Sequence, residues 1–148
     1  MIEYKEELLR YCIDEVKALV PQQWAEMAQG MNEIEENTDW DEYLASEGKK
    51  EAFLITARRE NLIGYFGMRV KPFASSQKHL AATSLPYFVV KCRDRGLILR
   101  RLIRVATETA KARGATMVAI KTHPWASAAP LLERMRFKPL ETWYTLKI

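Results

Sequence analysis

The segment that decides the fold is Val89–Ala115, VVKCRDRGLILRRLIRVATETAKARGA, in which arginines surround the start of a predicted helix. Its apolar residues recur at helical spacing, at Ile98, Leu99, Leu102, Ile103, Ala106 and Ala110. The basic run 111–113 and the Gly114 that follows are typical of a helix C-terminus. A helix N-terminus already carries partial positive charge, so cations crowded there indicate a site for an anion. The arginines around the predicted helix start are Arg93, Arg95, Arg100 and Arg101.

The residues on either side of this helix have the pattern of strands. A β-rich run at 79–90 precedes it, and a short, nearly continuous apolar run at 115–122 follows, typical of a buried parallel strand. We expect a right-handed crossover between them, with Pro86 marking a bulge or the end of regular pairing. A strand, a glycine turn at Gly96 and a helix together favour phosphate binding, because the first helical N–H groups lack intrahelical partners.

The rest of the chain completes a mixed α/β pattern. We predict a helix over 3–20, a second helix that restarts at Pro21, and a mostly irregular acidic connection over 32–50. Strands are predicted at 51–59 and 62–71 as a hairpin, followed by a last helix over 123–137 and a closing strand or short hairpin over 138–148. With 148 residues and no repeat or linker, residues 1–148 are expected to form a single domain.

Charge divides the chain into two parts. Residues 1–50 hold 13 acidic and 5 basic side chains, whereas residues 51–148 hold 6 acidic and 18 basic ones. An acidic half favours a cationic substrate, and a basic half favours phosphates of a cofactor or of nucleic acid. Both halves are equally compatible with ordinary solvated surfaces.

Composition excludes several other classes. Two histidines and no carboxylate cluster predict no metal site, and two distant cysteines predict reduced thiols in a cytoplasmic protein. No apolar run reaches the roughly 20 residues of a membrane span, and the charged N-terminus does not have the pattern of a signal peptide.

Residues 93–98, RDRGLI, resemble the acyl-CoA-binding signature Q/R-x-x-G-x-G/A of the GNAT superfamily of N-acetyltransferases. ASAAPLLERMRF, residues 126–137, is similar to a later family segment, N-x-x-A-x-x-x-Y-x-x-x-G-F, with Ala128 and Phe137 in place. The resemblance covers 51–148 well and extends loosely to the N-terminal helices; it is closest to small, divergent, phage-type members. It implies a GNAT-like fold with an N-terminal helix pair and a mixed sheet whose central strands splay apart.

The same resemblance implies a cofactor and a reaction. Acetyl-CoA would donate its acyl group directly to an amine acceptor, a small cationic molecule or a protein amine, that enters past the acidic N-terminal segment. The pantetheine arm would pair with the backbone near Phe88 and Val90. The pyrophosphate would lie on N–H groups from Asp94 to Leu99, and with the arginines the implied cofactor set is Phe88, Val90, Arg93, Asp94, Arg95, Gly96, Leu97, Ile98, Leu99, Arg100 and Arg101.

Departures from the family pattern concern catalysis. Leu132 stands where the family often has a general-acid tyrosine, Trp125 replaces its asparagine, and Arg136 replaces its glycine. No carboxylate occurs between Glu60 and Asp94 to serve as a base on the strands there. The remaining catalytic candidates are His123, Tyr87 and Tyr144, with Cys92 a weaker one. The acidic residues that could attract a cation are Glu33, Glu35, Glu36, Asp39 and Asp41.

Three functions therefore remain open from the sequence. The first is an acetyl-CoA-dependent N-acetyltransferase. The second is a catalytically degenerate GNAT-like module that binds CoA or serves as a structural partner, and the third is a nucleic-acid-associated GNAT protein. Nucleic acid is the least favoured partner, since the arginines would be committed to one cofactor. A second copy of the chain could complete the sheet in a homodimer.

Overall fold

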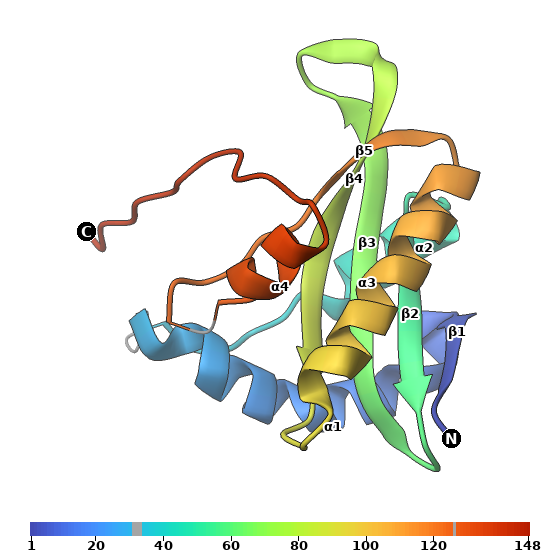
Figure 1. The fold of residues 1–148 in the computed structure, drawn as a ribbon, viewed down its shortest axis with the longest axis vertical. Helices are drawn as coiled ribbons and strands as arrows, with labels where there is room; N and C mark the ends of the chain where they lie inside the picture. The colour runs from blue at the N-terminus through green and yellow to red at the C-terminus, as the bar shows by residue number, and fades with distance from the viewer. Residues whose placement is uncertain (31–33, 126) are drawn as a thin grey trace.

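A five-stranded mixed sheet forms the centre of the protein in the computed structural model, which describes residues 1–30, 34–125 and 127–148 (Figure 1). The strands lie in chain order, and their bounds are β1 (Glu3–Glu7), β2 (Ala52–Arg58), β3 (Leu62–Phe73), β4 (Ser76–Val89) and β5 (Ala115–Ala119). The first four strands pair antiparallel, and β5 pairs parallel to β4. The expected mixed α/β sheet is therefore confirmed.

Helices cover both faces of this sheet. Helix α3 (Arg95–Ala112) crosses one face, and α1 (Leu9–Met27) and α2 (Trp40–Gly48) lie on the other (Figure 1). A short 3₁₀ turn, η1 (Ala28–Gly30), extends α1, and α4 (Ala129–Arg134) follows β5. Each face has its own apolar cluster, so the sheet is buried between two layers of helix.

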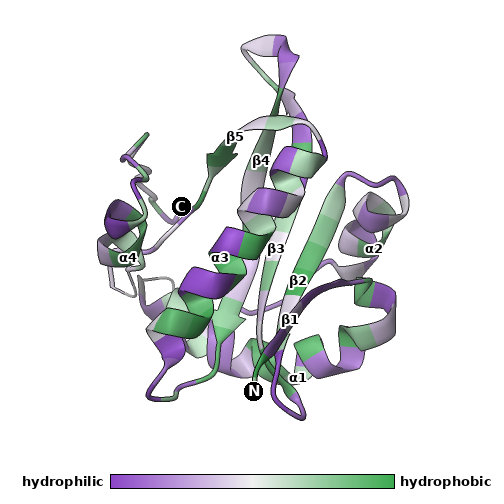
Figure 2. Ribbon diagram, turned by 45° about the vertical axis from the view of Figure 1, so that its right-hand side comes forward, coloured by the Kyte–Doolittle hydropathy of each residue, from purple (hydrophilic) through white to green (hydrophobic). Residues whose placement is uncertain are grey.

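The α3 face holds the larger cluster. The apolar residues of α3 fall on one side of the helix, and Ile98, Leu102 and Ile103 are at most 1% exposed (Figure 2). They pack against Phe66 and Met68 of β3, both fully buried. Each such side chain contributes about 1.5–3 kcal/mol by burial, so the predicted apolar stripe anchors α3 to the sheet.

The predicted hairpin, bulge and helix end are confirmed. Strands β2 and β3 pair antiparallel, and the β3–β4 register shifts between Phe66 and Met68, where Leu85 and Pro86 form the bulge. Helix α3 ends at Ala112, and Gly114 follows with φ of +92°. Glycine adopts this left-handed conformation without the steric penalty of a Cβ atom.

The helix predicted over 3–20 is wrong at its start. Residues 3–7 form β1, the edge strand, which pairs with β2 from Glu3–Arg58 to Glu7–Leu54. Ile2, directly before β1, and Tyr4 within it pack against the α3-side core, while the charged residues of β1 are largely exposed. Pairing with β2 therefore overrides the helical propensity of this charged segment.

The helix pair also differs from the prediction. Helix α1 runs without interruption through Pro21, so no second helix restarts there. Pro21 has no N–H to donate to the Lys17 carbonyl, four residues earlier. Both residues are exposed, so water can donate to that carbonyl instead. The second helix of the pair is α2, inside the 32–50 segment expected to be mostly irregular, and Asp39 caps it by accepting the Glu42 N–H.

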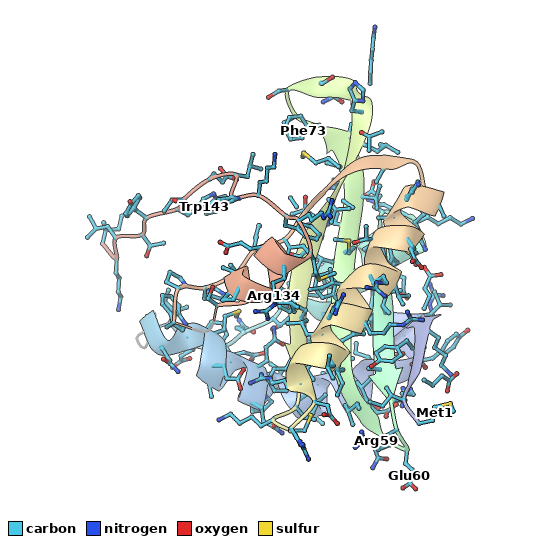
Figure 3. The ribbon with its side chains drawn as sticks, in the orientation of Figure 1. Met1, Arg59, Glu60, Phe73, Arg134 and Trp143 are labelled. Carbon is cyan, nitrogen blue, oxygen red and sulfur yellow. The ribbon has the colours of Figure 1, made fainter. Side chains whose placement is uncertain are left out.

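The end of the chain departs furthest from expectation. Residues 137–148 contain no strand, so the predicted closing strand or hairpin is wrong, and Trp143, Tyr144 and Leu146 are mostly exposed (Figure 3). The last helix is confined to residues 129–134. Within the described ranges, β5 has only β4 as a partner, and it is half-buried rather than buried because no described strand pairs with its outer edge.

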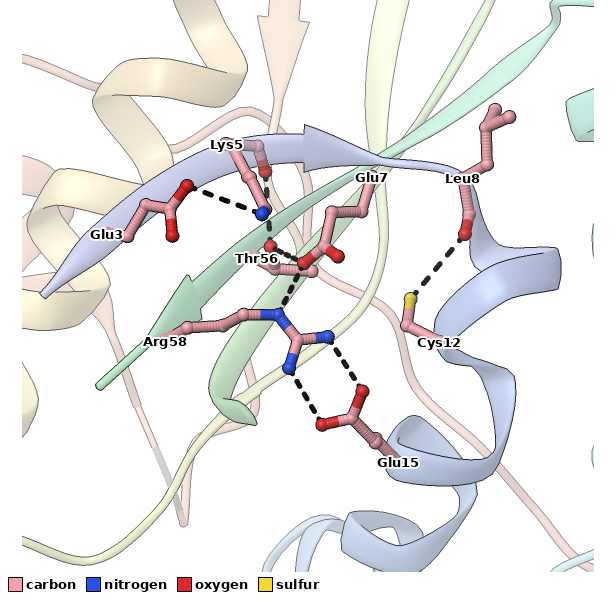
Figure 4. Close-up of polar contacts among 8 residues, drawn as sticks. All are labelled: Glu3, Lys5, Glu7, Leu8, Cys12, Glu15, Thr56 and Arg58. Atoms are coloured by element: carbon pink, nitrogen blue, oxygen red, sulfur yellow. Dashed lines mark hydrogen bonds and ion pairs between the residues drawn. The ribbon is translucent and has the colours of Figure 1, made fainter. Parts of the chain in front are cut away.

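A network of ionic hydrogen bonds joins β1, β2 and α1 (Figure 4). Arg58 donates to Glu7 over 2.7 Å and to both oxygens of Glu15 over 2.8 Å each. Thr56 donates to the same Glu7 carboxylate. These side chains connect the edge strand and the first turns of α1 to the sheet.

Candidate functional site

The pairing of β4 with β5 ends halfway along β4, where β5 itself ends. Their parallel ladder runs from Leu80–Ala115 to Thr83–Ala119 and ends there. Beyond it, two side chains of β4 bridge to the peptide of Lys121. The Lys121 N–H donates to Ser84 Oγ over 2.9 Å, and the Tyr87 hydroxyl donates to the Lys121 carbonyl over 2.7 Å. The predicted splay of the central strands is thus present, held by two side-chain bonds.

The N-terminus of α3 lies directly after the splayed end of β4. The N–H of Arg95 donates to the Cys92 carbonyl over 3.3 Å, and that of Ile98 donates to the Asp94 carbonyl over 3.0 Å. The N–H groups of Gly96 and Leu97, in the first turn, remain for a ligand. The Asp94 side chain makes no capping hydrogen bond that would block them.

The space beside the Cα atom of Gly96 is open. A Cβ atom on Gly96 would meet no described heavy atom within 4 Å, and its φ is not positive. Neither internal packing nor backbone strain therefore requires glycine here. Space beside a helix N-terminus fits an anion that approaches the backbone closely, as the pyrophosphate of CoA would.

The four arginines do not act as one group. Arg93 and Arg100 are exposed beside the turn, whereas Arg95 forms an ion pair with Glu26 of α1 and lies 5.4 Å above the Phe88 ring. Arg101 points to Tyr4 of β1, 6.0 Å from its ring centre, at the sheet edge opposite β5. Arg101 therefore lies beside β1 and away from the turn, and Arg95 already has a carboxylate partner.

The two predicted backbone partners of the pantetheine arm, Phe88 and Val90, face β3. The Val90 N–H donates to the Ile63 carbonyl over 2.9 Å, so it is committed to β3. Backbone groups alternate between the two sides of an antiparallel strand, and Phe88, opposite Tyr65, therefore also faces β3. Tyr87 and Val89 present their backbone groups to the gap instead.

Two predicted cofactor residues serve the helix itself. The Ile98 side chain is 1% exposed and packs in the core, turned away from the open turn. Its N–H is used by the Asp94 carbonyl. Leu99, one position further into α3, is half-buried and packs against the same core, so both residues anchor the helix.

The catalytic candidates lie in different places. His123 is half-buried at the end of the segment after β5 and stacks on Trp125 with ring centres 5.2 Å apart. Burial lowers the pKa of His123, so the imidazole is neutral at pH 7. Tyr87 stacks on Phe66, and burial raises its pKa, opposed in part by a hydrogen bond from Thr122. Tyr144 is 92% exposed on the C-terminal segment, and a catalytic role for it stays a prediction.

Sequence reasoning missed the residues that hold the gap in place. The Trp125 indole N–H donates to the carbonyls of Glu26 and Met27 over 3.1 and 3.0 Å. Glu26 in turn holds Arg95, so the end of α1 connects the His123 loop to the start of α3. Trp125 stood out only as a replacement for the family's asparagine, and Glu26 gave no signal, because contacts between residues 69 positions apart leave no periodic pattern.

A cavity of about 380 Å³ lies between α1, α2 and the sheet. It reaches the bulge through Gly67, Leu85 and Pro86, and its opposite side is lined by the residues that precede α2. Of the acidic residues predicted to attract a cation, Glu35, Glu36 and Asp39 line it, and Asp41 does not. Glu33 lies outside the described residues.

Leu132, at the position of the family's tyrosine, is buried in the α3-side core and has no acidic proton.

Other site types find no support in the described part of the chain. No group of three or more His, Cys, Asp or Glu side chains there could hold a metal ion. None of its helices is both long and apolar enough to cross a membrane.

Comparisons with known proteins agree with the fold. No family model and no curated protein sequence matches the chain. A solved ribosomal-protein-alanine N-acetyltransferase from Brucella melitensis biovar Abortus 2308 has a TM-score of 0.74 and 16% identity, covering 100% of this chain and 99% of that one. A predicted acetyltransferase with acetyl-CoA from Clostridium acetobutylicum has a TM-score of 0.67 and 18% identity, covering 99% and 96%. An aminoglycoside acetyltransferase with sisomicin, from an uncultured soil metagenomic sample, has a TM-score of 0.63 and 15% identity, covering 99% and 97%. The chain therefore has the fold of the GNAT-type acetyltransferases.

Proposed function

We propose that this protein is an N-acetyltransferase that moves the acetyl group of acetyl-CoA directly to a primary amine. The observation that carries the proposal is the gap between β4 and β5, with the open turn of α3 at its base and a cavity beyond the bulge. A phosphate site and an acceptor cavity on either side of a strand gap suit a long donor and a separate acceptor. The fold shared with solved acetyltransferases supports this assignment.

The chain's own groups divide the binding of CoA among them. The N–H groups of Gly96 and Leu97 bind the pyrophosphate, and the guanidinium groups of Arg93 and Arg100 neutralise its charge. The backbone of Tyr87 and Val89, which faces the gap, holds the extended pantetheine arm as an added strand would. When bound, acetyl-CoA supplies a thioester carbonyl that a neutral amine attacks.

The transfer forms a C–N bond and breaks the C–S bond of the thioester. An ammonium acceptor gives up one proton before attack and a second afterwards, so the products are the acetamide, the CoA thiol and one released proton. His123, neutral and at the end of the gap, is the base we assign to the ammonium. Leu132 is buried and carries no proton, so we assign protonation of the departing thiolate to water.

A degenerate CoA-binding module is the second candidate, and one set of observations favours it. The Tyr87 hydroxyl already donates to the Lys121 carbonyl, Tyr144 is exposed to solvent, and Leu132 is part of the core. The Tyr87 phenol is therefore committed to a structural hydrogen bond, and Leu132 has no acidic proton to donate. Such a protein would bind acetyl-CoA with no turnover.

Amine-dependent thiol release from acetyl-CoA, followed across pH, separates the two candidates. We expect log(kcat/KM) to rise with a slope of one below the pKa of His123, which lies under its usual value of 6.5, and to level off above it, because only neutral His123 takes the proton of a bound ammonium. The His123→Gln variant should keep a slope of one throughout and lose about 100-fold in rate. Binding of acetyl-CoA without thiol release from any amine would establish the degenerate module.

A further inference from the structure

The cavity beside the bulge has the chemistry of one acceptor class. Resting on the proposed function, we infer that the acceptor is a primary amine on a single apolar body, such as an arylalkylamine, and not a polyhydroxylated polycation. The argument uses the walls of the cavity, its charge and its polar groups in turn.

The walls of the cavity are aromatic and aliphatic. Trp24 of α1, Trp40 and Tyr43 of α2 and Tyr65 of β3 contribute rings, and valines and leucines of α1 and β2 fill the spaces between them. The Trp40 and Tyr43 rings meet edge to face with centres 6.1 Å apart. Such walls favour a flat or branched apolar body over a hydrated one.

The charge of the lining has one sign. Among the described residues that line the cavity, five are carboxylates and none is Lys, Arg or His. Two of the five are in ion pairs: Glu42 pairs with Arg69, and Glu47 pairs with Arg10 and accepts the N–H of Leu9. The three others, Glu35, Glu36 and Asp39, are exposed and precede or begin α2. Glu36 and Asp39 accept hydrogen bonds from neutral groups, the Thr38 hydroxyl and the Glu42 N–H. In a chain of net charge +4 this local negative group attracts an ammonium ion.

The polar groups of the cavity walls limit how many charged groups of a ligand can be buried there. The Tyr65 hydroxyl donates to Gln23 Oε1, so these two pocket residues already bond each other. A guest with several ammonium and hydroxyl groups would bury some of them against rings without partners, which is unfavourable. A single amine that reaches the bulge at Leu85 and Pro86, with its apolar body between α1 and α2, avoids this.

Specificity constants for matched amines test the inference. With acetyl-CoA as donor, we expect kcat/KM to be at least about 30-fold higher for 2-phenylethylamine than for spermidine or sisomicin. The reason is that the extra polar groups of spermidine and sisomicin would be buried in the cavity without hydrogen-bond partners. Higher values for spermidine or sisomicin would overturn the inference.

Variants of the cavity provide the structural control. The Trp40→Ala variant should raise KM for 2-phenylethylamine at least about fivefold and leave KM for acetyl-CoA unchanged. The double variant Glu35→Gln, Glu36→Gln should raise KM for 2-phenylethylamine about threefold at low salt and much less at 0.5 M salt. Glu60→Gln, an exposed site in the β2–β3 turn, is the matched control and should change neither.

Calorimetry with 2-phenylethylamine alone makes the inference independent of turnover. Saturable binding that Trp40→Ala weakens would support the cavity assignment even if acetyl-CoA fails to bind, an outcome that would contradict only the proposed function. The inference would be overturned if Trp40→Ala left the affinity for 2-phenylethylamine unchanged, or if no binding were seen at millimolar amine. Neither result bears on acetyl-CoA binding, which is measured separately.

Discussion

Gly96 is the residue whose identity carries the most information about the site. It lies in the first turn of a helix, has an ordinary φ, and has open space where a side chain would begin. Glycine inside a helix is less stable than alanine, so its presence needs a reason outside the folded chain itself. Close approach of a ligand to the Gly96 N–H supplies that reason.

The Gly96→Ala variant should therefore separate folding from binding. We expect the free energy of unfolding to rise by about 0.5–1 kcal/mol, because alanine favours the helix, while acetyl-CoA affinity falls at least about tenfold. Urea unfolding and calorimetry measure the two effects. Gly48→Ala, at the end of α2 with equally open surroundings, should give the stability gain alone. Unchanged acetyl-CoA affinity in Gly96→Ala would refute the pyrophosphate assignment.

Arg136 is a residue where the chain departs from the family pattern and bears a conformational cost. It follows α4 with φ of 69°, and the Phe137 N–H donates back to the Leu132 carbonyl over 2.9 Å, as at a glycine-terminated helix. Arg136→Gly should raise the free energy of unfolding by about 1 kcal/mol, seen as a higher urea midpoint with the same slope. Arg134→Gly, inside α4, should instead destabilise the protein.

At the scale of elements, the attachment of β1 depends on charge. Burial raises the pKa of Glu7, but hydrogen bonds from Arg58 and Thr56 outweigh it and leave that pKa below its ordinary value of 4.5. The hydrogen bond from Arg58 likewise lowers the pKa of Glu15. Carboxyls with lowered pKa values stabilise the fold above about pH 4.5, and that stability is lost as pH falls through the lowered values.

Replacing Arg58 by methionine should expose this dependence. We expect a loss of about 1–3 kcal/mol at pH 7, because Glu7 is left partly buried without its donor. The difference from wild type should shrink as pH falls below 4.5 in urea unfolding measured from pH 7 to pH 3. Glu3→Gln, in the exposed pair with Lys5, serves as control and should stay within about 0.5 kcal/mol. A difference that stays constant with pH would contradict the network's role.

Elements with a strong internal pattern were predictable from the sequence, and those defined by partners were not. The stripe on α3, the β2–β3 hairpin and the bulge at Pro86 follow from periodicity and proline chemistry. β1 was missed because a charged segment becomes a strand only by pairing with β2. The closing strand was predicted from residues that have strand character but no partner in the structure.

The site divides in the same way. Its proposed location at the start of α3 rests on Gly96 and the arginines, which are local in sequence. The side of β4 that faces the gap, the Glu26 partner of Arg95 and the Trp125 bond to α1 depend on register and on contacts between distant segments. Periodicity fixes which residues share a face, but not which neighbour that face meets.

For the whole molecule, the helices, the strand gap and the cavity surround the sites we propose for a donor and an acceptor. Arg95 and Trp125 connect α3, α1 and the segment after β5, so a donor bound in the gap would contact all three. Binding of acetyl-CoA should therefore stabilise the entire fold rather than one loop, because only the native state brings these segments together.

The melting temperature with and without acetyl-CoA tests this most directly. At about 100 times the dissociation constant, a ligand of the native state adds about 2.7 kcal/mol, which for a chain of this length raises Tm by about 5–10 °C. Pantetheine, which lacks the pyrophosphate, should produce a much smaller shift, and Gly96→Ala should reduce the shift from acetyl-CoA. No change in Tm at millimolar acetyl-CoA would contradict the assignment of this fold to acetyl-CoA chemistry.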